Sequence, residues 1–237
     1  SEYWSQRQAD GFAAARDRGV SLLFLGSDTL AWRVRYAPAS ARSSQAGAPD
    51  QVIVAYKEHA QLDPDRSHPT GPFPGGGAPL AGSAYVGCIT PRLRVAGSPQ
   101  YRYYSWQPAA RLWPSWLFAR AGIGPLTRIP GIVGYELDVR TGQSPPGTAL
   151  IGFGHATCMH AAAGEPQPGR NQNLAETTLY RARSGAIVFD SGTLGWELGL
   201  EPVPSASPDA PRAPDPRVVR MTRNLLGFVL GPRPLRA

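Results

Sequence analysis

The sequence predicts an α/β fold with a mostly parallel central sheet, and three observations predict it. A helix with a capping signal opens the chain, short apolar runs of strand length follow it, and an amphipathic helix closes it. Gly and Pro number 27 and 25 of the 237 residues, which is too many for a helical bundle. A chain of this length can bury a substantial core, and we expect one domain over residues 1–237.

The first helix is predicted from the spacing of Ser5 and Gln8, which is that of a capping box, and Gly19 supplies a stop. Residues 20–25 (VSLLFL) then form an apolar run of buried-strand length. Residues 51–56 (QVIVAY) form a second run, rich in β-branched side chains. A helix followed by buried strands favours an α/β layer.

Two segments lack any periodic pattern and are rich in small and turn-forming residues. Residues 38–50 and residues 60–81, with PTGPFPGGGAP at the centre of the second, are expected to be surface loops that add nothing to the core. Residues 101–116 are dense in Tyr and Trp, which favours a packed loop, with a pocket wall as the alternative.

The later part of the chain is expected to be mainly β, followed by a helix. Four segments have strand length and turn-like flanks: residues 131–137, 148–153, 177–182 and 186–189. A Pro-rich linker covers about residues 202–214. Asp215 and Pro216 then have the form of a helix start, and Val218, Met221 and Leu225 lie on one apolar stripe that we expect to pack on the sheet.

The formal charge of +7 does not predict nucleic-acid binding. Lys57 is the only lysine, and the arginines are scattered singly, which indicates biased composition rather than a phosphate-binding patch. No apolar run is long enough to span a membrane. Cys88 and Cys158 allow one bridge at most, so we expect a cytoplasmic protein that binds neither nucleic acid nor membrane.

The standard catalytic motifs are weak or missing. Asp190 opens an Asp-Ser-Gly-Thr turn of aspartic-protease form, but there is no second copy, so a tight turn after a strand is the better interpretation. His155, Cys158 and His160 could be metal ligands, yet a zinc site lacks further partners elsewhere. His155 follows a predicted strand, and on that position it is our candidate for carrying a proton.

Several pieces, taken in order, resemble the C-terminal domain of the N,N-dimethylformamidase large (beta) subunit family. They include EYWS, SLLFLGSDTLAWRVRY, VAYK, RIPGIVGYELD, TLYRARSGAIVFDSGTLGWELGL and DPRVVRMTRNLL, and they cover most of the chain outside the Pro/Gly-rich loops. The resemblance implies a flavodoxin-like, class I glutamine amidotransferase-like three-layer sandwich with loop insertions and a β-rich late section. Because the family normally has Gly-His-Asp before this first piece, we expect a part of a larger protein that lacks its first strand.

The resemblance also implies a mononuclear iron held by two tyrosinates and one glutamate. Carried over by motif, the ligands are Tyr3, Tyr56 and Glu136, with Tyr135 and Glu58 as neighbours that could take the last two places. Phenolates and carboxylates are hard oxygen ligands that suit Fe(III). The iron would activate a water that attacks the carbonyl of a small amide.

The expected function is therefore iron-dependent hydrolysis of the C–N bond of a small, dimethylformamide-like amide. His155 would protonate the departing amine. The alternatives are a non-catalytic structural or ligand-binding domain of the same family, and a hydrolase that uses Cys88 or Cys158 as its nucleophile. Expected partners are the small amide, the remainder of a larger polypeptide, and a small subunit or further copies of the chain.

Overall fold

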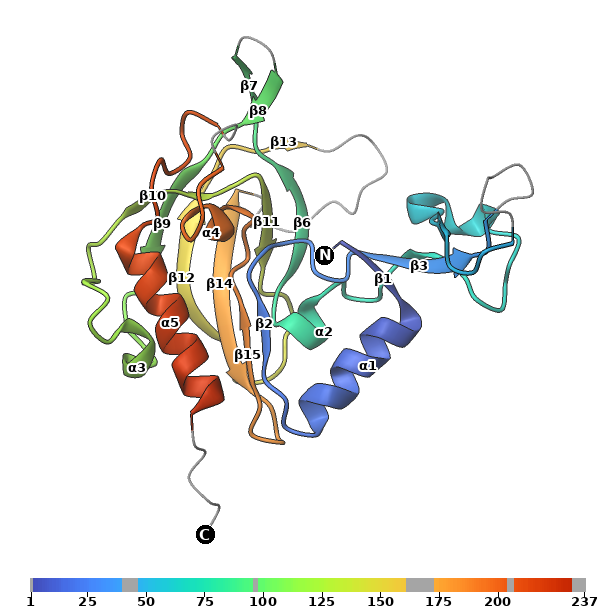
Figure 1. Cartoon of the computed structure of the whole chain (residues 1–237), viewed down its shortest axis with the longest axis horizontal. Helices are drawn as coiled ribbons and strands as arrows, with labels where there is room; N and C mark the ends of the chain where they lie inside the picture. Colours follow the sequence, from blue (N-terminus) through green and yellow to red (C-terminus); the bar gives the residue numbers. More distant parts are fainter. Residues whose placement is uncertain (1, 40–46, 96–97, 161–172, 204–206, 232–237) are drawn as a thin grey trace.

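The computed structural model describes residues 2–39, 47–95, 98–160, 173–203 and 207–231. Its architecture is a curled, mixed sheet that forms a half-barrel, with one long helix on each side of it (Figure 1). The prediction of a flavodoxin-like three-layer sandwich with a mostly parallel sheet is therefore wrong. The reason lies in how the strands pair, which short sequence windows do not reveal.

The largest sheet has six strands in the order β10-β9-β12-β14-β15-β2. Their bounds are β2 Leu22–Phe24, β9 Tyr104–Pro108, β10 Ile129–Val133, β12 Ala149–His155, β14 Leu174–Arg181 and β15 Ile187–Asp190. Only the β15–β2 ladder of this sheet is parallel. Antiparallel neighbours need no helical crossover, so helices do not cover both faces of this sheet as they would in a doubly wound fold.

Three smaller sheets complete the β structure. The first joins β1 (Tyr3–Ser5), β3 (Trp32–Ala37), β4 (Val52–Val54) and β5 (Gly71–Pro72); the second has the order β11-β6-β13, and the third is the β7–β8 hairpin. The bounds of the last five are β6 Ala84–Ile89, β7 Arg92–Val95, β8 Ser98–Tyr101, β11 Glu136–Val139 and β13 Met159–His160. Strand β1 runs parallel to β3, and β11 runs antiparallel to β6.

Both predicted long helices are confirmed, together with their caps. Helix α1 covers Gln6–Asp17, and its capping box has both reciprocal bonds between Ser5 and Gln8. Helix α5 covers Pro216–Leu230, with Asp215 accepting a hydrogen bond from the Arg217 N–H. The remaining helical segments are short: η1 Lys57–Leu62, α2 Ala78–Ala81, α3 Ser115–Phe118 and α4 Gly195–Leu198.

The main core lies between the six-stranded sheet and α5. Val218, Met221 and Leu225 of the predicted stripe are buried there, beside Trp106 and Trp196. A second core cluster lies under α1 and includes Phe73, Leu80 and Ala81. The expectation that residues 60–81 add nothing to the core is therefore wrong, because the Gly/Pro-rich segment carries apolar side chains between its turns.

Strand β4 is present as expected but is not buried. Val52 and Ile53 are 39% and 56% exposed, because β4 pairs with β3 at the outer part of an arm that extends from the body (Figure 1). A run of β-branched residues is the same signal in a buried strand and in an exposed one. Within the described ranges, no helix has both the length and the apolar character needed to cross a bilayer.

Candidate functional site

Tyr3 lies on β1 beside the only lysine of the chain. Its Cα partner on β3 is Trp32, and the Lys57 ammonium lies 4.9 Å from the centroid of the Tyr3 ring and 5.2 Å from that of Trp32. The Lys57 Nζ is also 3.6 Å from Glu2 Oε1. Burial raises the pKa of the Tyr3 phenol, and the hydrogen bond with Lys57 partly opposes this shift.

Glu136 begins β11 and faces the loop that joins β2 to β3. In this loop Asp28 has a φ of 57°, in the left-handed region, and its side chain forms a hydrogen bond with Glu136. The Asp28 backbone N–H donates to Asp138 Oδ1 across 2.9 Å. Contacts with Glu136 and Asp138, the two acidic residues of β11, therefore hold the loop to this strand.

The carboxyl groups of Asp28 and Asp138 are shielded from solvent. Burial raises the pKa of both well above its ordinary value, and repulsion from neighbouring acids, Asp138 on Asp28 and Asp190 on Asp138, adds to the shift. Asp28 Oδ1 and Asp138 Oδ2 are buried without a hydrogen-bond partner. Such atoms are costly in a folded protein, so they mark a place where a ligand or water completes the site.

Asp190 is a further buried member of this acidic group. It accepts hydrogen bonds from the Ser83 hydroxyl at 2.6 Å and from the Gly192 N–H at 3.0 Å, and it is fully buried. Burial raises its pKa to about 7, although both hydrogen bonds act in the opposite direction. The sequence therefore predicted the tight turn after β15 correctly, and Asp190 in addition belongs to the acidic group.

Two further phenols lie near Glu136. Burial raises the pKa of Tyr103 and of Tyr135 to about 12, and the charge of Glu136 adds to both shifts. The Tyr135 ring stacks on Tyr101 with 4.2 Å between centroids. Tyr103 of the aromatic segment therefore lies near Glu136, while Trp106 packs in the core as expected for a packed segment.

The structure places Glu136 beside Asp28, on whose carboxyl the charge of Glu2, the sequence neighbour of Tyr3, also acts. It holds Tyr56 in another environment. The Tyr56 N–H donates to Thr70 Oγ1 at 3.0 Å, and its phenol interacts with Arg35, which pairs with acidic residues of the β3–β4 arm. Tyr56 is nevertheless the neighbour in sequence of Lys57, which reaches Tyr3.

His155 lies at the end of β12, where its exposed ring packs edge-on against Phe153 with 5.8 Å between centroids. It lines a hollow of about 250 Å³ whose other walls include Arg128, Tyr104 and Gln107. None of the acidic residues described above lines this hollow.

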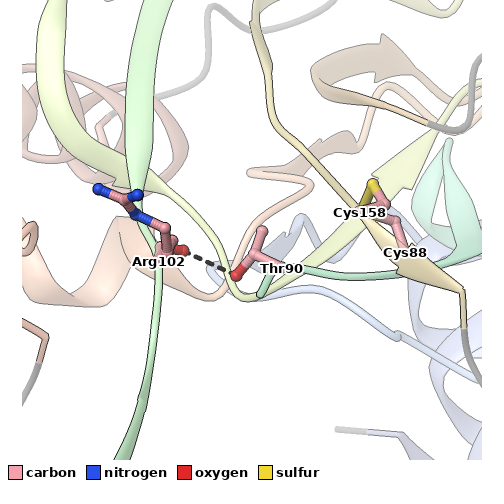
Figure 2. Close-up of a disulfide and its surroundings, with 4 residues drawn as sticks. All are labelled: Cys88, Thr90, Arg102 and Cys158. Carbon is pink, nitrogen blue, oxygen red and sulfur yellow. Dashed lines mark hydrogen bonds between the residues drawn. A yellow bond between two sulfur atoms is a disulfide. The ribbon is translucent and has the colours of Figure 1, made fainter. Parts of the chain in front are cut away.

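Cys88 and Cys158 form a disulfide (Figure 2). It fastens the end of β6, where Ile89 is the Cα partner of Glu136, and nearby the Thr90 hydroxyl donates to the Arg102 carbonyl at 2.7 Å. A bonded cysteine has no thiolate, so the disulfide contradicts both a cysteine nucleophile and a zinc site that uses Cys158.

Sequence reasoning missed Asp28 and Asp138. A signal was available for each: Asp28 follows the buried run of β2, and Asp138 is two residues after Glu136, on the same face of a strand. Across the described ranges, no group of three or more His, Cys, Asp or Glu side chains could hold a metal ion.

Comparison with known proteins gives one finding. A family model described as N,N-dimethylformamidase beta subunit-like, C-terminal, matches residues 1–210. No curated protein matches the chain. The matched range contains β1, the Asp28 loop, β11 and the turn after β15, and so Asp28, Glu136, Asp138 and Asp190.

Proposed function

Because the chain belongs to the N,N-dimethylformamidase beta subunit-like C-terminal family, we propose that it hydrolyses the C–N bond of a small amide at the acidic site where the Asp28 loop meets β11. The observation that carries this proposal is the pair of buried, unpartnered carboxyl oxygens on Asp28 and Asp138. Leaving such an atom without a partner costs about 1–3 kcal/mol, so a purely structural site would pair or replace it.

Iron is the metal that we propose, with Tyr3, Tyr56 and Glu136 as its ligands. The donor chemistry fits, since phenol and carboxylate oxygens are hard ligands. The position of Glu136 beside Asp28 supports its assignment, and Tyr3 and Tyr56 share Lys57 as a neighbour, since its ammonium lies over the Tyr3 ring and Tyr56 precedes it in sequence. When bound, the metal supplies a Lewis acid for the amide carbonyl and lowers the pKa of a water.

The chain's own residues would prepare the site. The Asp28 carboxyl, whose pKa is raised by burial, holds a proton that it can share with Glu136 and so fixes the orientation of that carboxylate. The Lys57 ammonium lies against Tyr3 and favours its ionised form. His155 remains the predicted proton donor for the departing amine, and its variant is considered in the Discussion.

A second candidate is a binding domain without turnover. The observation in its favour is the position of Lys57, whose ammonium already supplies a positive charge at Tyr3. A phenol that is paired with an ammonium does not require a metal. The second candidate therefore predicts a chain that binds small amides and holds no iron.

The family description names a beta subunit, so we also propose further polypeptide partners. The remainder of a larger chain, a small subunit and additional copies are the candidates. Native mass spectrometry of the protein isolated from its source distinguishes a single chain from a hetero-oligomer and from a homo-oligomer.

Turnover tests the proposal directly. We expect the purified chain to release dimethylamine from N,N-dimethylformamide, and Glu136→Gln to lower kcat/KM by at least 100-fold because a carboxylate ligand is lost (about 2.7 kcal/mol). Glu201→Gln is the matched control, since Glu201 is exposed on another segment. Equal rates for the two folded variants, or no turnover of any small amide, would contradict the proposal.

A further inference from the structure

A cavity of about 430 Å³ lies between the start of β3 and strand β6. Its lining includes Ala31 and Trp32 from the start of β3, Ala84 and Tyr85 from the start of β6, and Phe73 with the glycines that follow it. The turn after β11, which contains Gln143, completes the lining.

The cavity has apolar walls and a polar rim. Trp32 and Phe73 are buried, whereas Thr141 and Gln143 are exposed. The rim is a hydrogen-bonded turn, in which the Gln143 N–H donates to Thr141 Oγ1 at 3.1 Å. The Gln143 carboxamide packs so closely on Gly75 that a Cβ at that position would clash with it. This combination of apolar walls and a few placed polar groups is typical of small-molecule sites.

The cavity is lined from strands that pair with those of the proposed site. Trp32 is the Cα partner of Tyr3, and the Lys57 ammonium lies 5.2 Å from the centroid of the Trp32 ring. On the other side, Tyr85 is the Cα partner of Asp138. Two lining residues of the cavity are thus the direct strand neighbours of Tyr3 and Asp138.

Its size exceeds what a dimethylformamide needs. That molecule has five heavy atoms, about 150 Å³ if each takes the roughly 30 Å³ share of a water molecule. An amide with a phenyl substituent, such as acetanilide, has ten heavy atoms, or about 300 Å³ on the same scale. The flat faces of Trp32 and Tyr85 also suit an aromatic ring.

We propose that this cavity binds the aromatic N-substituent of an amide, so that anilide-like compounds are the substrate class; the substrate assignment rests on the proposed function. The amide group would lie toward Tyr3 and Glu136, and the ring would lie between Trp32 and Tyr85. A binding measurement tests ligand binding in the cavity independently of amide hydrolysis.

Isothermal titration of the full chain with acetanilide and with acetamide, in the presence of a chelator, tests the cavity alone. We expect acetanilide to bind at least tenfold more tightly, because only it carries a ring. Ala31→Phe fills the cavity and is expected to weaken acetanilide binding at least tenfold, while Ala110→Phe, at an exposed position elsewhere, leaves it unchanged. If Ala31→Phe fails to fold, Thr141→Trp at the exposed rim takes its place.

Equal binding of the two amides, or acetanilide binding that the cavity variants leave unchanged, would overturn the proposal. Failure of the proposed function has another signature. If the chain binds acetanilide in the cavity but hydrolyses no amide, the cavity proposal is supported and the proposed hydrolytic function is contradicted. If the chain hydrolyses dimethylformamide but binds acetanilide no better than acetamide, the proposed hydrolytic function is supported and the cavity proposal is contradicted.

Discussion

Asp28 donates its backbone N–H to the Asp138 carboxylate across 2.9 Å, and this bond joins the loop after β2 to the strand that begins with Glu136. The loop would otherwise be hard to hold, because Asp28 and Leu30 both have a φ of 57°. Non-glycine residues in this region cost of order 1–3 kcal/mol and persist where surrounding contacts enforce them. The strained loop and the acidic site therefore depend on each other.

Asp28→Asn separates the structural role of Asp28 in the loop from the role of its carboxyl group in the acidic site. Asparagine tolerates the left-handed backbone and keeps the N–H bond to Asp138, but it removes the acid that contacts Glu136. We expect a folded variant whose midpoint of unfolding changes by a few degrees at most, with at least tenfold lower kcat. Circular dichroism and the amide assay provide the two readouts, and unchanged turnover would exclude a role for the Asp28 carboxyl in the reaction.

The buried acids predict a distinct dependence of stability on pH. The pKa of Asp190 is raised to about 7 from 3.8, so its contribution to stability is fully present below pH 4 and is lost as the pH rises through about 7. Burial raises the pKa of Asp28 and Asp138 in the same direction. We expect the free energy of unfolding to fall between pH 4.5 and 7.5, and less steeply in Asp190→Asn.

Urea titrations across that pH range measure the free energy of unfolding. The quantity to compare is its slope against pH in the wild type and in Asp190→Asn, rather than the absolute stability of the variant. The contribution of Asp63 to stability depends on pH in the opposite direction. The hydrogen bond from Arg35 lowers the pKa of Asp63, so this contribution is lost only at strongly acidic pH. A stability that rises from pH 4.5 to 7.5 would show that the acidic group is ionised at little cost.

Removing the disulfide is expected to cost about 4 kcal/mol of unfolding free energy, because Cys88 and Cys158 close a loop with a sequence separation of 70. The variant that carries both Cys88→Ser and Cys158→Ser should match the reduced wild-type protein. Dithiothreitol should destabilise the wild type and leave the double variant unchanged. Equal stability of oxidised and reduced wild type would show that the bridge does not constrain the chain.

His155→Gln tests the prediction that His155 protonates the departing amine. A general acid contributes about 10²–10⁴-fold, so that role requires a fall in kcat of this size with KM little changed. His68, which is largely exposed on the β3–β4 side, supplies the control variant His68→Gln. If His155→Gln has the same kcat as the control, the hollow with Arg128 takes no part in the reaction.

Local signals predicted the helices well and the sheet poorly. Ser5 with Gln8 and Asp215 with Pro216 fix helix starts through contacts within one turn, and both are confirmed. The partner of a strand is set by residues far away in sequence. The run over 51–56 therefore predicted a strand correctly and its burial wrongly.

The candidate site was predictable only in part. The resemblance selected Glu136, which the structure places beside the Asp28 loop, and Tyr3, which it places beside Lys57. Asp28 and Asp138 were missed because single acidic residues in loops and strand ends are common, and only folding removes their solvent and places them together. The role of Lys57 beside Tyr3 was equally invisible, since it depends on how β1, β3 and η1 meet.

Iron content and the visible spectrum of the purified full chain test the central claim most directly. The account predicts near-stoichiometric iron and a phenolate-to-iron absorption band that Tyr3→Phe weakens or shifts. Tyr36→Phe, which alters an exposed phenol on the same sheet, should leave the band unchanged. A folded, colourless protein without metal would contradict the iron-dependent hydrolase and favour the binding domain in which Lys57 supplies the charge at Tyr3.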